Sequence, residues 1–382
     1  MKAVPFFIIR MERKTVKKNT RALLLPIFFS AVLLLSGCSS HLSLFFGHQK
    51  DVESISKEKY AYSCLSIEEK KLYDIMLDAF LHFREEVVIN TVEPDVLEKL
   101  FYAIFSDYGG LFWVDGYSYS SKSNGDSPNM LFSPDFSMTK KEKEEKEALV
   151  EKAKKEWLSG ISNDSPDFYK SLYVYENIVS RVDYDEDAPD SQNILSVFLN
   201  GRSVCQGYAD AAGVLFDELG IKNVILRGTA QGDPHSWNMI MLDNEWYFFD
   251  ATWGNNRFLD KNADKKTVNY AYLNLTSEEM EKTHIIDMDI PIPNCTATEN
   301  NYYNKMGLFF DSFDKASIGR AFSNSYRSGD SQCSVKFKTP TLYYQAVDFF
   351  VRNGNLGRYC EGLSYIYYNE RRDVLVLTIY FF

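Results

Sequence analysis

The sequence predicts an α+β protein with more than one domain. Two apolar patterns indicate this class: helical spacing in segments such as 67–84, and alternation of apolar and polar residues in segments such as 333–338. Asp243 and Asn244 tolerate the left-handed backbone of a tight turn and separate two further strand-like segments, which predicts an antiparallel hairpin. The length of 382 residues fits about two to three domains.

Composition and charge exclude several classes of protein. Hydrophobic residues make up 45% of the chain and charged residues 25%, which is typical of globular proteins and excludes disorder, collagen or a coiled coil as a description of the whole. The net charge is −11, and the first 37 residues carry +6, so the remainder carries −17. Such an acidic surface repels a phosphate backbone, so we expect no nucleic-acid partner.

The N-terminal residues have the pattern of a secretory signal. A basic segment precedes the mostly apolar stretch 22–35, which is too short to span about 30 Å of hydrocarbon. The residues that follow, Leu35-Ser36-Gly37-Cys38, resemble the bacterial lipoprotein signal, in which the cysteine becomes the lipidated first residue. This resemblance implies that residues 1–37 are removed and that lipid on Cys38 anchors the protein to the bacterial membrane through a tether, residues 38–59. We therefore expect an extracytoplasmic location, on the outer face of the cell membrane or in the periplasm.

Three regions follow the tether. Residues 60–160 are predicted to form an N-terminal α/β region, 161–290 the core, and 298–382 a C-terminal α+β domain. The first region is expected to contain helices at 67–84, 95–105 and 139–158, a buried strand at 111–114, and a loop or insertion at 118–137. A helix at 167–182 leads into the core. In the last region we expect a half-buried strand at 333–337, a strand at 374–382, and helices at 315–326 and 342–351.

Cys205 precedes a predicted amphipathic helix that ends at Gly220. We expect Ser203 to cap this helix, which would put Cys205 in the first turn, where the unpaired backbone N–H groups and the helix dipole stabilise a thiolate. Taken alone, a cysteine is more often an inert core residue. Apart from Cys38 and Cys205, the chain has four cysteines: Cys64, Cys295, Cys333 and Cys360. Five thiols form no disulfide scaffold and leave at least one free.

A histidine and an aspartate flank the predicted hairpin. With a two-residue loop, Thr252 would lie across from His235, and Asp250 would lie two places away on the same face, within reach of the imidazole. A three-residue loop would send the two side chains to opposite faces. The other imidazoles are less suitable partners for Cys205: His41 and His48 lie in the tether, and His82 and His284 are expected to be structural or to form a second polar group near the site. A thiol, an imidazole and an acid are the parts of a nucleophilic triad. No close Cys/His cluster predicts a metal, and we expect no cofactor.

The residues around this triad resemble a known family. Three blocks carry the likeness: Val204-Cys205-Gln206-Gly207-Tyr208-Ala209, His235-Ser236-Trp237-Asn238, and Trp246-Tyr247 with Asp250-Ala251-Thr252-Trp253. Together they resemble the transglutaminase-like superfamily of papain-type thiol enzymes over roughly residues 165–285. The resemblance implies a core in which the helix of the cysteine packs on an antiparallel sheet. It also implies that Cys205 is the nucleophile, His235 the general base and acid, and Asp250 the residue that orients His235.

Residues beside the triad are candidates for substrate binding. Gln206 would contribute to an oxyanion site or face away from it. Trp237 and Trp253 would line an acyl-acceptor channel, although aromatic residues on a hairpin are more often core residues.

The resemblance implies a thiol enzyme that acts on amide bonds of protein glutamine or of a peptide. A thioester would be resolved by an amine in a transglutaminase, or by water in an amidase or peptidase, and the sequence does not decide between these acceptors. Two alternatives stay open: a non-catalytic cell-surface binding module on the same fold, and a cell-wall peptide hydrolase. The presence of all three triad residues favours an enzyme.

Overall fold

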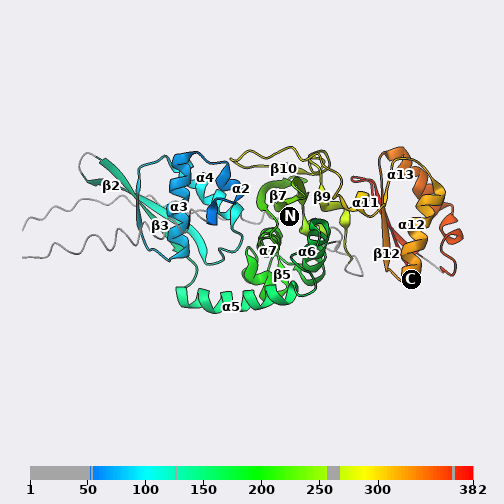
Figure 1. The fold of residues 1–382 in the computed structure, drawn as a ribbon, viewed down its shortest axis with the longest axis horizontal. Helices are drawn as coiled ribbons and strands as arrows, with labels where there is room; N and C mark the ends of the chain where they lie inside the picture. The colour runs from blue at the N-terminus through cyan, green and yellow to red at the C-terminus, as the bar shows by residue number, and fades with distance from the viewer. Residues whose placement is uncertain (1–51, 53–54, 125–126, 256–266, 364–365, 382) are drawn as a thin grey trace, which may run out of the picture. The chain divides into compact units, whose positions relative to one another are not determined.

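A computed structural model describes residues 52, 55–124, 127–255, 267–363 and 366–381 (Figure 1). The predicted signal, residues 1–37, the lipidation site Cys38 and most of the tether lie outside the described residues. The chain divides into two compact units: one runs to Glu151 and includes Asp289–Pro291, and the other comprises Lys152–Met288 and Ile292–Phe382. Within the described part of the chain, no helix has both the length and the apolar character needed to cross a membrane.

The first unit combines short helices with a three-stranded sheet. Its elements are α2 (Tyr60–Ser63), α3 (Ile67–Leu81), β1 (Val87–Asn90), α4 (Pro94–Asp107), β2 (Val114–Asn124) and β3 (Ser127–Phe136), and the strand order is β1-β3-β2 with antiparallel pairing. The helices predicted at 67–84 and 95–105 are confirmed. The buried carboxylate of Asp107 accepts hydrogen bonds from the backbone N–H groups of Ala61 and Tyr62 and from the Tyr73 hydroxyl, which fixes α2 to α4.

Two predictions in this unit are wrong. Residues 118–137 are not a loop: most of them belong to the β2–β3 hairpin, in which Tyr119 pairs with Phe132 and the rings of Tyr117 and Phe132 stack at 5.3 Å. The serine- and asparagine-rich composition suggests a loop, but cross-strand aromatic packing favours a sheet. Residues 111–113 are buried but form a turn, and the strand begins only at Val114, because a short apolar run has no period that distinguishes a strand from other buried structure.

A charged helix joins the two units. It is α5 (Lys140–Trp157), and it begins with a capping box: Thr139 Oγ1 accepts from the Glu142 N–H at 3.3 Å, and a Glu142 carboxylate oxygen accepts from the Thr139 N–H at 2.8 Å. Opposite charges four residues apart pair along the helix, as in Lys143–Glu147. The predicted helix at 139–158 is therefore confirmed.

The second unit contains an antiparallel sheet with the order β10-β6-β7-β8-β9. Its strands are β6 (Asn223–Ala230), β7 (Asp233–Leu242), β8 (Glu245–Phe249), β9 (Leu273–Leu275) and β10 (His284–Ile286). Two helices accompany it, α6 (Asp167–Arg181) and α7 (Cys205–Glu218), and α7 packs on β6 and β7 (Figure 1). The Asn238 side chain of β7 donates to the Ala209 carbonyl of α7 at 2.9 Å. The predicted α+β core, with the cysteine helix on an antiparallel sheet, is confirmed.

Short elements connect these parts of the core. They are β4 (Asp183–Tyr184), the π-helical turn η1 (Ser196–Asn200), β5 (Arg202–Ser203), α8 (Ala251–Gly254), the 3-10 turn η2 (Tyr270–Tyr272), α10 (Ser277–Met280) and α11 (Tyr302–Lys305). The strands β4 and β5 pair in parallel immediately before α7.

The C-terminal part has its own sheet and core. The strands β11 (Phe309–Phe310), β12 (Gln332–Phe337), β13 (Ile366–Arg371) and β14 (Val376–Phe381) have the order β11-β12-β14-β13, and they pack with α12 (Lys315–Ser328), α13 (Pro340–Ala346), η3 (Val347–Arg352) and η4 (Asn355–Arg358). The predicted helices and the strands at 333–337 and 374–382 are confirmed, and α12 and α13 both contact β12 (Figure 1).

The strand at 333–337 is not half-buried as expected. Every residue from Cys333 to Phe337 is buried. The polar side chains are buried with partners: the hydroxyl of Ser334 lies 2.8 Å from that of Thr378, and the ammonium of Lys336 pairs with Glu279 of α10. Alternation predicts which residues share a face, but not whether another segment covers the polar face.

Candidate active site

Cys205 is the first residue of α7 and lies at its N-terminus. The expected cap is wrong by one residue: Val204 is the N-cap and has no side-chain capping bond, whereas Ser203 lies in β5 and donates its hydroxyl to the Ser191 carbonyl at 2.6 Å. The pairing of β5 with β4 holds Ser203 in the strand and away from the cap position. Gly220 has the left-handed backbone, φ 69°, that follows the end of the helix.

The predicted hairpin and its register are confirmed. Asp243 and Asn244 have φ angles of 52° and 67°, and Leu242 pairs with Glu245 across a two-residue loop. The prediction that Thr252 lies across from His235 is wrong, because β8 ends at Phe249 and α8 begins at Ala251. Asp250 is the N-cap of α8, and its Oδ1 accepts from the Trp253 N–H at 3.1 Å, so the turn into α8 fixes the carboxylate.

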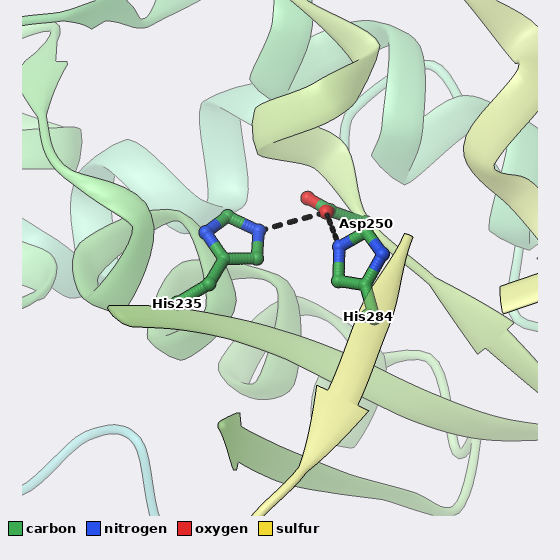
Figure 2. A group of neighbouring side chains, drawn as sticks. All are labelled: His235, Asp250 and His284. Atoms are coloured by element: carbon green, nitrogen blue, oxygen red, sulfur yellow. Dashed lines mark hydrogen bonds and ion pairs between the residues drawn. The ribbon is translucent and has the colours of Figure 1, made fainter. Parts of the chain in front are cut away.

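These elements bring an acid, an imidazole and a thiol together. Figure 2 shows the His235 ring directed at Asp250, and its Nε2 lies 2.8 Å from Asp250 Oδ2. The Cys205 thiol at the start of α7 also acts on this ring, because it contributes to raising the pKa of His235. Since Nε2 faces the carboxylate, Nδ1 is the ring nitrogen left for the thiol. His235 and Asp250 are 3% and 1% exposed, so this contact is shielded from water.

Burial and charge act in opposite directions on His235. Burial alone lowers its pKa, but the adjacent Asp250 carboxylate and the Cys205 thiol outweigh this effect and raise the pKa to about 10. Burial would raise the pKa of Asp250, but the charge and hydrogen bond of His235, with a further contribution from His284, hold it well below its usual range. At neutral pH the pair is therefore an imidazolium and a carboxylate.

A second imidazole lies against the same carboxylate oxygen. His284 Nε2 is 3.1 Å from Asp250 Oδ2, and Figure 2 shows the ring reaching Asp250 from β10. Burial lowers the pKa of His284, as does the nearby charge of His235, although Asp250 acts in the opposite direction. The sequence left the position of His284 open, because the edge strand β10 comes 34 residues after Asp250 and the hairpin register does not reach it.

A comparison with known protein families finds a match over the part of the chain that contains these residues. Residues 155–251 match the family model of the transglutaminase-like superfamily, and this match includes Cys205, His235 and Asp250. The chain contains a transglutaminase-like domain. This fold belongs to a family of thiol enzymes. No curated protein matches the chain significantly.

Two solved structures are similar at low identity. One is described as a TGase, with 14% identity and a TM-score of 0.26, covering 44% of this chain. The other is described as a candidate cysteine protease from Cytophaga hutchinsonii, with 16% identity and a TM-score of 0.24, covering 39% of this chain. The matched segments span 50% and 65% of those two proteins.

Two indole rings enclose the imidazoles of the transglutaminase-like domain. Trp237 stacks on His235 with ring centroids 5.8 Å apart, and Trp253 lies 6.1 Å from the same ring. Both indoles also contact His284, at 5.0 and 4.8 Å. With exposures of 1% and 4%, neither indole is open to solvent, and the two rings exclude water from the imidazole pair.

Gln206 takes part in a hydrogen-bonded chain beside Cys205. Its carbonyl oxygen accepts from the Ser236 hydroxyl at 2.7 Å, and its amide group donates to Asp210 at 2.8 Å. Burial raises the pKa of Asp210 well above its usual value, although the bond from Gln206 opposes this shift. The transglutaminase-like domain thus holds the Gln206 amide in one orientation next to the nucleophile.

Three side chains of this domain are of the types that bind metal ions, and the cysteines of the described residues are unpaired. His235, Asp250 and His284 place ligand atoms within 4.8 Å of one another, a group of three that could hold a metal ion. Each imidazole already uses Nε2 in a hydrogen bond to the shared carboxylate, so the cluster is satisfied by hydrogen bonds. The cysteines of the described residues, Cys64, Cys205, Cys295, Cys333 and Cys360, all carry free thiols.

Proposed function

We propose that the transglutaminase-like domain is a thiol enzyme that acts on amide bonds of proteins or peptides, with Cys205 as nucleophile. The observation that carries this proposal is the position of His235, which is hydrogen-bonded to Asp250 at 2.8 Å through Nε2, with Cys205 at the N-terminus of α7 acting on the pKa of the same ring. An imidazole held between an acid and a thiol at a helix N-terminus forms a thiolate–imidazolium pair. Asp250 orients His235 and stabilises its charge.

The proposed reaction has two steps. The Cys205 thiolate attacks the amide carbonyl and forms a carbon–sulfur bond, and the tetrahedral intermediate then breaks its carbon–nitrogen bond. His235 gives its proton to the departing amine or ammonia, which leaves a thioester. In the second step an amine or water attacks the thioester, His235 takes a proton from it, and the thiolate is released. The Cys205 N–H lies in the first turn of α7, where backbone N–H groups lack intrahelical acceptors, so it is a candidate donor to the oxyanion.

We also propose that the protein is an extracytoplasmic lipoprotein anchored through Cys38. The support is the lipoprotein-like sequence Leu35-Ser36-Gly37-Cys38 and the basic and apolar segments before it. A protein or peptide at the cell surface would then be the substrate. The acyl acceptor is an amine if the enzyme crosslinks proteins, and water if it cleaves them.

The first test is alkylation of the full-length chain in detergent by iodoacetamide as a function of pH, followed by peptide mass spectrometry. Cys64, which is partly exposed like Cys205, serves as an internal reference. We expect Cys205 to react at least about tenfold faster than Cys64 at pH 6 and to lose this advantage in His235→Ala. Equal reactivity of the two thiols, unchanged by His235→Ala, would contradict the proposed enzyme and favour a binding module.

A second assay identifies the acceptor. The chain is incubated with a glutamine-containing protein and a labelled primary amine, and separately with peptidoglycan peptides. Labelled or higher-mass protein identifies a transglutaminase, whereas released fragments identify a peptidase or a cell-wall peptide hydrolase. Cys205→Ala should abolish either product.

A further inference from the structure

We propose that His284 is a positioning residue for the triad: a neutral imidazole that donates its Nε2–H to Asp250 and thereby fixes the carboxylate to which His235 is bound. The inference rests on the proposed function, because His284 would act on Cys205 only through Asp250 and His235. Its basis is the contact between His284 Nε2 and Asp250 Oδ2 at 3.1 Å, on the same oxygen that accepts from His235 (Figure 2).

The hydrogen bonds of His284 assign its tautomer. A carboxylate only accepts hydrogen bonds, so Nε2 must carry a proton. The other ring nitrogen, Nδ1, lies 2.8 Å from the Thr283 hydroxyl, whereas the Met280 carbonyl, the other acceptor near this hydroxyl, is 3.4 Å away; we therefore assign the hydroxyl proton to Nδ1. With Nε2 donating and Nδ1 accepting, the ring is fully hydrogen-bonded as a neutral imidazole. Protonation at Nδ1 would instead place a second positive charge beside His235, whose ring centroid is 5.3 Å away.

The surroundings of His284 also favour the neutral form. Its side chain is 0% exposed. The ionisable groups in contact with it are Asp250, His235 and Tyr272, whose ring centroid lies 5.9 Å from that of His284. The hydroxyl of Tyr272 in turn accepts a hydrogen bond from Arg371 at 3.4 Å. Trp237 and Trp253 cover the remaining sides.

This arrangement gives Asp250 a donor on each side. Oδ1 accepts from the Trp253 backbone, and Oδ2 accepts from both imidazoles. With both oxygens bound, the carboxylate has one orientation, which fixes the His235 ring through Nε2 and leaves Nδ1 for the thiol. Removal of His284 frees Asp250 to rotate about its terminal torsion, so the imidazolium is held less firmly against Cys205.

The test compares His284→Leu with His284→Gln in the full-length chain, because a glutamine amide can still donate to Asp250. The readout is the pH midpoint of Cys205 alkylation relative to Cys64. We expect His284→Leu to slow Cys205 alkylation at pH 6 about tenfold and to move its midpoint toward that of Cys64, and we expect His284→Gln to recover most of the rate. If the folded His284→Leu chain keeps the wild-type midpoint, His284 only fills space and the inference is wrong.

His82→Leu is the matched control. His82 also bonds an aspartate, with Nδ1 2.9 Å from Asp78 Oδ1, but it belongs to the first unit. The same substitution there should leave the Cys205 midpoint unchanged. If wild-type Cys205 is no more reactive than Cys64, the proposed function fails, and this result is distinct from an unchanged midpoint in His284→Leu.

A second measurement reads the protonation of His284 in the wild-type chain directly. Nitrogen-15 NMR of the wild-type chain with labelled histidine reports the protonation of each ring nitrogen, and His284→Gln assigns the signal. We expect His284 to remain a neutral Nε2–H tautomer from pH 5 to pH 9. A cationic ring, or a proton on Nδ1, overturns the inference.

Discussion

At the residue scale, one carboxylate holds two imidazoles in opposite protonation states. Asp250 raises the pKa of both rings, yet the charge that one ring carries opposes a charge on the other. The Cys205 thiol also raises the pKa of His235, which favours its cationic form, whereas His284 has Thr283 at its second nitrogen and remains neutral. The group next to the second nitrogen of each ring therefore decides whether that ring carries an additional proton.

The protonation of His235 predicts how stability depends on pH. Its pKa in the folded chain is about 10, above the value of about 6.5 expected when unfolded, so its stabilising contribution is complete below about pH 6.5 and is lost as pH rises toward 10. One pKa unit corresponds to about 1.4 kcal/mol, so the contribution is on the order of a few kcal/mol. Urea unfolding of the wild type and of His235→Gln between pH 6 and 10 measures it. The gap between the two free energies of unfolding should shrink with rising pH, and parallel curves would contradict the assignment.

At the element scale, the hairpin and the edge strand β10 contribute to the site in different ways. The β7–β8 register brings Asp250 to His235 through local pairing, with Leu242 against Glu245 next to the turn. The edge strand β10 is held next to the site by its pairing with β6. In β6, Gly228 pairs on one side with His235 of β7 and on the other with Ile286 of β10. A Cβ at Gly228 would lie 1.9 Å from the Ile285 carbonyl oxygen, so only glycine permits this close approach.

Gly228→Ala should therefore displace β10 and separate His284 from Asp250. We expect a loss of stability of about 1–3 kcal/mol, as for overpacking, together with slower alkylation of Cys205 at pH 6. Thermal unfolding and the alkylation assay measure the two effects. Gly357→Ala is the control, since a Cβ there meets no atom within 4 Å. If the Gly228 variant behaves like this control, the close packing of β10 does not position the site.

At the scale of the whole molecule, the C-terminal sheet contacts the segments that lead to His284. Lys336 of β12 pairs with Glu279 of α10, and Arg371 of β13 donates to Tyr272. Burial would raise the pKa of Glu279, but Lys336 outweighs this effect and lowers it, so the pair is ionised. The C-terminal part thus supports α10 and Tyr272, which flank the second imidazole.

The proposed location of the whole protein depends on Cys38. Intact-mass measurement of the protein from a bacterial host should give a chain that begins at Cys38 and carries additional lipid mass, because the preceding residues match a lipoprotein signal. Cys38→Ala should abolish incorporation of labelled palmitate, and Cys64→Ala should leave it unchanged. An unlipidated wild-type chain would contradict the anchoring proposal.

The sequence by itself determined the elements that local patterns encode. Helical spacing predicted α3, α6, α7 and α12, and the Asp243–Asn244 turn predicted the register between β7 and β8. These predictions hold because periodicity, capping and turn chemistry depend on residues close together in the chain. The contact between His235 and Asp250 follows from the same hairpin register. However, β8 ends at Phe249, so the Asp250 carboxylate reaches His235 from the turn after the strand and not from the strand itself.

Only the tertiary structure decided what depends on distant segments. The β2–β3 hairpin forms from a composition typical of loops, because β2 and β3 pair with each other and β3 also pairs with the distant strand β1. Burial of Lys336 depends on Glu279, which lies 57 residues away in the chain. His284 reaches Asp250 because β10 pairs with β6 rather than with a neighbour in sequence. Long-range packing selects these contacts, since the free energy of a buried polar group depends on which partner the fold supplies.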